Sequence, residues 1–325
     1  MKTKVDKAEL LRKYGILLML LALIVYFSFG SKYFLTGGNI VNVLRQSAVT
    51  GISAVGLTYV MLTGGIDLSI GAVIGLTAVI ASSCMAKLGM SPLLACLIAL
   101  AVGVLIGLIN GILINYVEIP ALIATLGVMT SVRGMCYILT GGLPVYGFPA
   151  SFDILGKGYI GFIPVPVIVM ILVLVIGWYV LNRTQYGRYL YAIGGSREAS
   201  RLSGINVDKM ILATYMIAGF LSALAGLVEL SRLSSGQPAA GDGFEMNVIT
   251  AVVLGGISVN GGEGKLSGVV VGIFIMSVLA NGLVMMNVYE FYQQLIRGIV
   301  LIFAVGFDQL SKRKKATKKA KVKTA

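Results

Sequence analysis

The sequence lacks histidine altogether and is poor in charged residues and cysteine, which narrows the functions open to it. Without histidine the chain has neither the commonest general base nor the commonest metal ligand. Its three cysteines, Cys84, Cys96 and Cys136, are isolated in apolar surroundings, which indicates packing rather than a disulfide or a metal site. No nucleophile stands beside a base, and the carboxylates do not cluster. We therefore expect no catalytic residue, metal or cofactor, and we expect that the chain is not an enzyme.

Apolar residues make up most of the chain. Of the 325 residues, 57% are hydrophobic and only 12% are charged, about half the charged share of a soluble domain. The mean hydropathy is +0.93, and the 42 glycines are typical of helices that pack closely in lipid. The apolar runs are continuous rather than alternating, which favours helices over strands. The sequence predicts an all-α polytopic membrane protein.

These runs are separate enough to be counted. We predict about ten transmembrane helices, of which the eighth is short for a full crossing. Their expected ranges are 15–30, 47–63, 70–86, 92–116, 120–140, 163–181, 210–230, 246–259, 266–286 and 289–307. The segment 31–46 is interpreted as a polar connector that can contain an amphipathic piece at 39–44, and 141–162 as a connector rich in glycine and proline.

Basic residues gather at the two ends and in one long loop. The N-terminal segment 1–14, the loop 182–209 and the tail 309–325 all carry an excess of lysine and arginine. An even number of spans and the positive-inside rule place all three on one side, the cytoplasmic side of a bacterial inner membrane. A single transmembrane domain, 15–308, lies between the two ends. Because the basic residues lie at the ends and in the loop, the net charge of +13 does not indicate nucleic-acid binding. The polybasic run 312–323 is expected to rest on anionic lipid, with a docking role as the alternative.

Two stretches of the sequence resemble each other. Residues 52–75 align without gaps on 249–272, and glycines coincide at four pairs of positions. This predicts two pseudo-repeated halves, as in many transporters, although the biased composition leaves chance similarity as the alternative.

A polar break interrupts the first of these stretches at GGIDLS, residues 64–69. Two glycines permit an unwound backbone, and Asp67 or Ser69 could cap the next helix. Alternatively, Asp67 and Ser69 line a polar path and meet substrate hydroxyls. Asn110 and Asn281, each followed by glycine, are candidates for the same path or for packing between helices.

The segment GGEGKLSG, residues 261–268, is not a phosphate-binding loop. That motif would need glycine at Val259 and serine or threonine at Leu266. If transport uses ATP, another chain has to bind it.

The loop 182–209 contains a short stretch with a specific pattern. Residues 197–203 can form a helix, and Gly204 is a natural left-handed stop for it. EASRLSG, beginning at Glu198, is similar to the EAAxxxG pattern of ABC-importer permeases, with Ser200 in place of the second alanine. The segments GGIDLSIGA (64–72) and 243–272 also resemble the sugar-importer permeases, among them those for ribose. The resemblance extends from about residue 34 to residue 308.

The resemblance implies a permease that works as a homodimer with a cytoplasmic ABC ATPase subunit and an extracytoplasmic sugar-binding protein. The helix at 197–203 would then be a cytoplasmic coupling helix. The residues expected to contact the ATPase are Arg197, Glu198, Ala199, Arg201 and Gly204. The expected cargo is a sugar, with ribose first and other sugars or autoinducer-2 as alternatives. An ion-coupled secondary transporter is the alternative of another class, with Asp67 as its titratable group.

Overall fold

The computed structural model describes residues 7–323, with side chains described from 15 to 306 and at 309. The basic ends predicted at 1–14 and 309–325 therefore lie largely outside the described side chains. The long helices are α1 (Lys7–Gly30), α2 (Gly37–Leu62), α3 (Ile70–Ala86), α4 (Pro92–Asn115), α5 (Ala121–Thr140), α7 (Val165–Arg183), α10 (Val207–Leu233), α12 (Leu266–Met285) and α13 (Glu290–Lys323). The shorter elements are η1 (Ala150–Asp153), α6 (Ile154–Lys157), β1 (Tyr159–Ile160), β2 (Ile163–Pro164), α8 (Gln185–Gly195), α9 (Arg197–Leu202) and α11 (Phe244–Leu254).

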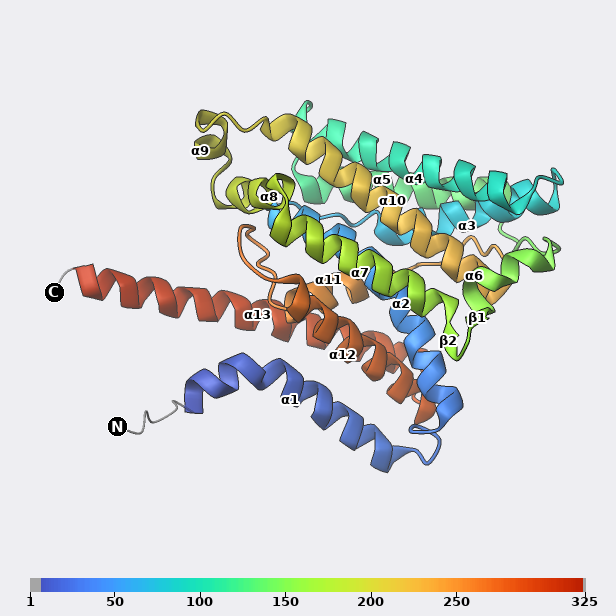
Figure 1. The fold of residues 1–325 in the computed structure, drawn as a ribbon, viewed down its shortest axis with the longest axis horizontal. Helices are drawn as coiled ribbons and strands as arrows, with labels where there is room; N and C mark the ends of the chain where they lie inside the picture. Colours follow the sequence, from blue (N-terminus) through green and yellow to red (C-terminus); the bar gives the residue numbers. More distant parts are fainter. Residues whose placement is uncertain (1–6, 324–325) are drawn as a thin grey trace.

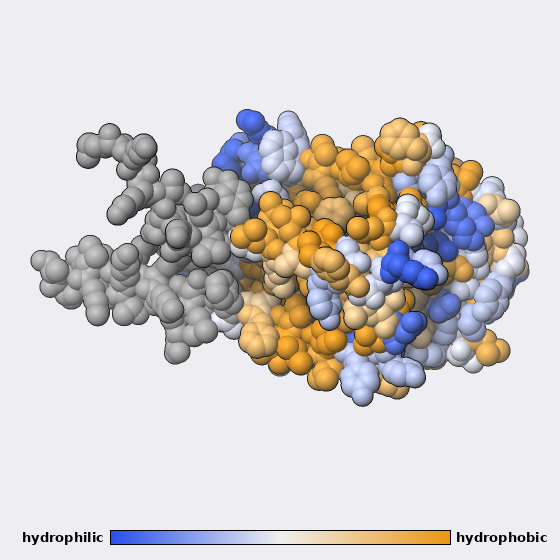
Figure 2. All heavy atoms as spheres, turned by 90° about the horizontal axis from the view of Figure 1, so that it is seen from below, coloured by the Kyte–Doolittle hydropathy of each residue, from blue (hydrophilic) through white to orange (hydrophobic). Residues whose placement is uncertain are grey.

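Several of these helices match the dimensions of a membrane. Within the described residues, α2, α4, α5, α7, α10 and α12 are long and apolar enough to cross one. Shorter apolar helices occur at 15–30, in α3 and in α11. Figure 2 shows hydrophobic residues gathered across the middle of one face, with hydrophilic residues toward both ends. The predicted polytopic helical membrane protein is confirmed at this level, and the number of ten spans stays a prediction.

The helices form an inner and an outer set. In α2 and α10, 67% of the most apolar stretch is buried, against 28% in α4, α5 and α7. The inner helices are rich in small residues, which lets backbones approach closely without leaving gaps. Gly103 and Gly107 of α4 face Gly219 of α10 so closely that a Cβ at any of the three would overlap the backbone of the other helix. Glycines on facing helices therefore determine how closely these helices pack.

The connector predicted at 31–46 is helical over more than the amphipathic piece expected at 39–44. No connector separates this piece from the span predicted at 47–63. Helix α2 begins at Gly37 and runs unbroken to Leu62. Its polar first turns are held by partners that a local pattern does not reveal. Arg45, for example, donates to the carbonyl of Lys157 at 2.9 Å and stacks over the ring of Tyr159 at 4.8 Å.

The prediction of an all-α fold needs a small correction. Strands β1 and β2 pair in antiparallel register. Strand β1, η1 and α6 lie within the connector 141–162, and β2 follows it at the start of the span predicted at 163–181. Gly161 makes the turn between the strands with a φ of +64°, a conformation that favours glycine. The remainder of the described chain is helical or irregular.

The helices run between two ends of the molecule. In Figure 1, α1 begins and α13 ends at the end where α8 and α9 lie, whereas α6 and the β1–β2 hairpin lie at the opposite end. We call these the loop end and the hairpin end. The two similar stretches, 52–75 and 249–272, both form a helix, a non-helical break and a second helix. Their common origin by duplication stays a prediction.

Candidate functional site

The loop 182–209 folds into two helices at the loop end. Helix α8 begins after Thr184, whose hydroxyl accepts from the backbone N–H of Gly187. Its side chains Leu190 and Ile193 are buried in the core. Helix α8 therefore packs against the long helices, which we call the membrane body, and α9 lies outside them.

Helix α9 is short and capped at both ends. The hydroxyl of Ser196 accepts from the N–H of Ala199 at 3.2 Å, as expected of an N-cap. The hydroxyl of Ser200 donates to the carbonyl of Ser196 at 2.8 Å. The helix ends at Leu202, and Gly204 has a φ of +81°. The structure therefore has the predicted helix and its left-handed stop, while its role in coupling stays a prediction.

The surface of α9 is exposed and mostly polar, with one apolar side chain at its tip. The residues expected to contact an ATPase, Arg197, Glu198, Ala199, Arg201 and Gly204, are all exposed. Arg201 forms an ion pair with Asp208 at 2.7 Å, and the two side chains are 60% and 43% exposed. A pair so well solvated is worth little, so a partner could replace it at small cost. Leu202 is 85% exposed, which leaves a large apolar side chain without cover in this chain.

Behind α9, three segments far apart in sequence meet through their backbones. The N–H of Gly262 donates to the carbonyl of Leu62 at 2.9 Å, which joins the end of α2 to the loop between α11 and α12. Gly194, near the end of α8, packs against both, and a Cβ there would overlap the carbonyl oxygen of Leu62 and the nitrogen of Gly262. We call this contact of Leu62, Gly194 and Gly262 the glycine junction. It connects the loop that carries α9 directly to both helix breaks.

Two tyrosines of α8 also fasten it to the membrane body. Tyr191 donates its hydroxyl to the carbonyl of Gly264 at 3.0 Å. The hydroxyl of Tyr186 lies 2.8 Å from that of Thr214 on α10. Burial raises the pKa of Tyr186 to about 12, and the hydrogen bond with Thr214 opposes this only in part, so the hydroxyl is protonated at neutral pH.

The break at 64–69 carries a buried polar network. One carboxylate oxygen of Asp67 accepts from the backbone N–H of Ser69 at 2.8 Å and from its hydroxyl at 2.6 Å. The amide of Asn110 donates to the same hydroxyl at 2.8 Å. Asp67 thus closes a turn onto Ser69, which precedes α3, and neither side chain caps an N–H inside the helix. The carbonyl oxygen of the Asn110 side chain is buried without a partner among the described residues.

The fourth residue proposed for a polar path lies elsewhere. Asn281 and Asn39 exchange amide hydrogen bonds of 2.8 and 2.9 Å across α12 and α2. The structure therefore brings Asp67, Ser69 and Asn110 together and sets Asn281 apart in a closed pair. The role of all four in transport stays a prediction.

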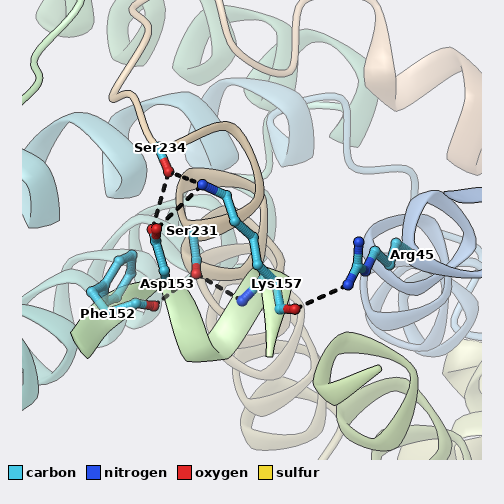
Figure 3. A network of polar contacts seen from close by, with 7 residues as sticks. Arg45, Phe152, Asp153, Lys157, Ser231 and Ser234 are labelled. Carbon is cyan, nitrogen blue, oxygen red and sulfur yellow. Dashed lines mark hydrogen bonds and ion pairs between the residues drawn. The ribbon is translucent and has the colours of Figure 1, made fainter. Parts of the chain in front are cut away.

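The hairpin end is organised by a second network, drawn in Figure 3. The hydroxyl of Ser231 donates to the carbonyl of Phe152 and accepts from the N–H of Gly156, each at 2.7 Å. Lys157 contacts both Asp153 and Ser234. Through these contacts the connector 141–162 is fixed to the end of α10, so that the two form one surface.

A comparison with known protein families matches most of the helical part of the chain, from α2 to α13. Residues 39–305 match the family described as the permease component of the branched-chain amino acid transport system. The chain belongs to this permease family.

Several relatives of the permease have names that describe sugar transport. The ribose import permease protein RbsC of Escherichia coli K12 is 43% identical over 296 residues, which cover 90% of this chain and 92% of the relative. RbsC of Bacillus subtilis 168 is 42% identical over 301 residues, covering 92% and 93%. The xylose transport system permease protein XylH of E. coli K12 is 33% identical over 366 residues, covering 94% and 93%. No solved structure matches the permease.

Sequence reasoning singled out neither Gly194 nor Ser231 of this permease, and it noted Gly262 only as a glycine shared by the two similar stretches. The paired glycines at 194–195 and 261–262 were a usable signal, since they interrupt polar segments where close backbone contact is plausible. What each glycine touches depends on segments more than sixty residues away and has no local signature.

We predict that a substitution in the glycine junction destabilises the protein and that the same substitution at the next residue does not. Gly194→Ala should lower the free energy of unfolding by about 1–3 kcal/mol, because the new methyl group would separate α8 from Leu62 and Gly262. Gly195→Ala is the matched control, since a Cβ there meets nothing within 4 Å. Thermal unfolding in detergent measures both, and equal midpoints would refute the junction as a tight contact.

A second prediction separates structure from transport at Asp67. Asp67→Asn keeps the oxygen that accepts from Ser69 and should fold normally, but it should reduce transport if the charge meets the cargo. Asp67→Ala removes the acceptor and should destabilise the protein by about 1–3 kcal/mol. Transport by the asparagine variant at the wild-type rate would leave Asp67 with a structural role alone.

Proposed function

We propose that this chain is the membrane-spanning subunit of an ATP-driven importer of ribose. The observation that carries the proposal is the 43% identity to a ribose import permease over nine-tenths of both chains, against 33% to a xylose permease. Membership of the permease family supports ATP-driven import over the ion-coupled alternative. Import of xylose or another sugar, or of autoinducer-2, remains the second candidate.

In this proposal the chain crosses a bacterial inner membrane ten times, with both ends and α9 in the cytoplasm. Three facts support this arrangement. The first residues of α1 and the last residues of α13 lie at the loop end, as do α8 and α9 (Figure 1). The loop 182–209 is basic, as the positive-inside rule requires of a cytoplasmic loop. The outer helices α4, α5 and α7 expose apolar faces suited to lipid or to a second copy of the chain. Two copies would enclose the pore.

The ATPase would act on α9. An exposed helix with Arg197 and Arg201 one turn apart and Leu202 at its tip suits a groove with an acidic rim and an apolar floor. When the ATPase closes, α9 would move with α8 as a rigid body, and the glycine junction would pass the movement to both helix breaks. The breaks at 64–69 and 255–265 would thereby change access to the pore.

The binding protein would dock at the hairpin end. The segments 141–162 and 231–245 lie side by side there, joined by backbone hydrogen bonds of 2.9 and 2.8 Å between Val145 and Gly236. Arg133 fastens the second segment by donating to the carbonyls of Pro238 and Ala240. Exposed side chains such as Phe162 and Tyr146 give this surface apolar contacts.

Reconstituted uptake tests the proposal and supplies our third prediction. Proteoliposomes that contain this permease, its ABC ATPase and its sugar-binding protein should accumulate labelled ribose only when ATP is present. Excess unlabelled ribose should suppress the signal more strongly than xylose at equal concentration. Uptake driven by a proton gradient in the absence of the ATPase would overturn the ATP-driven mechanism. Stronger suppression by another sugar would overturn the choice of ribose.

A further inference from the structure

A polar cavity lies among the inner helices, apart from the Asp67 network. Its volume is ≈ 120 Å³, which approaches the roughly 150 Å³ of an engineered cavity that admits a benzene ring. Helices α2, α3, α10, α11 and α12 all contribute to its wall. Its principal polar and aromatic side chains are those of Gln46, Thr50, Glu229, Arg232, Phe244 and Asn247, together with Ser277.

A charged pair forms one side of this cavity. Arg232 donates two hydrogen bonds to the two carboxylate oxygens of Glu229, at 2.9 and 2.8 Å. The two side chains are only 24% and 17% exposed. A bidentate pair keeps both charges in place and leaves unused lone pairs on the carboxylate and N–H groups on the guanidinium. Such a pair can receive from one hydroxyl and donate to another, which is the pattern that a polyol presents.

On another wall is a hydroxyl that the protein leaves unpaired. Ser277 of α12 is 3% exposed, and its hydroxyl oxygen has no hydrogen-bond partner among the described residues. A buried polar group without a partner is costly, so folded proteins seldom retain one. Elsewhere in the chain, buried serines such as Ser53 and Ser222 donate to the carbonyl four residues earlier, and Ser277 does not. The hydroxyl therefore remains available to a molecule in the cavity.

We propose that this cavity is a weak binding site for the sugar cargo within each permease chain. Hydroxyls of a pentose would bond to the Glu229–Arg232 pair, to the amides of Gln46 and Asn247, and to Ser277. The ring of Phe244 would cover an apolar face of the sugar. Since the binding protein provides affinity, weak contacts at this site suit rapid release. This inference rests on the proposed function, because it assigns that function's cargo to particular residues.

Two serine variants test the site against a purely structural cavity filled with water. Ser277→Ala removes the unpaired hydroxyl, so the midpoint of thermal unfolding should stay equal or rise while ATP-driven ribose uptake falls about fivefold. Ser83→Ala is the matched control. Its hydroxyl is also buried without a partner, but it lines a different cavity that is mostly apolar. This control should leave uptake at the wild-type rate.

Filling the cavity supplies the second arm of the same experiment. Ser277→Leu should reduce ribose uptake more than tenfold, while the loaded binding protein still stimulates ATP hydrolysis. If both Ser277 variants transport like the wild type, the cavity holds only water and the inference is overturned. If the wild-type complex shows no ATP-driven ribose uptake, the proposed function fails, and the assignment of this cargo fails with it.

Discussion

The glycine junction is the contact on which the arrangement of this permease depends. Leu62 ends α2, Gly262 lies in the loop before α12 and Gly194 is the last residue but one of α8. The three meet through backbone atoms. Backbone contacts of this kind cannot adapt by changing rotamers, so movement of one segment has to move or break the others. In the proposed coupling, a push on α9, two residues beyond Gly195, would therefore reach both helix breaks without a long chain of intermediates. The tyrosines at 186 and 191 hold α8 against sliding relative to this junction.

The membrane body is consistent with a transporter that binds its cargo weakly. Its buried polar side chains are largely satisfied within the protein, as Asn39 and Asn281 are by each other. The exceptions are informative because each unsatisfied buried group has an energetic cost. Ser277 faces a polar cavity, and the side-chain oxygen of Asn110 belongs to the network next to the break at 64–69. Two of the five buried side-chain atoms that lack a partner in the described part of the chain thus lie where we propose that the cargo binds or passes.

Much of this architecture follows from sequence, and the exceptions share one cause. Long apolar runs predicted the membrane helices, because lipid allows few other structures, and Gly204 marked the end of α9 through its backbone freedom. The first turns of α2 were expected only as a possible amphipathic piece at 39–44. Asn39 and Arg45 are polar, and their partners Asn281 and Lys157 lie more than one hundred residues away. Asp67, Ser69 and Asn110 were named as candidates, but their shared network required the fold. The cavity at Ser277 was not foreseen, since its wall draws on five helices.

The central claim is that α8, the end of α2 and the loop 255–265 move as one body during transport. The most direct test uses a variant with Cys84, Cys96 and Cys136 replaced and new cysteines at Gly195 and Glu263, the exposed positions that follow Gly194 and Gly262 of the glycine junction. A short, cleavable cross-link between the two positions should leave ATP-driven uptake at the rate of the uncross-linked protein, because the cross-link joins parts that already move together. Loss of uptake on cross-linking, with recovery on cleavage, would show that these segments slide past each other and would contradict the account.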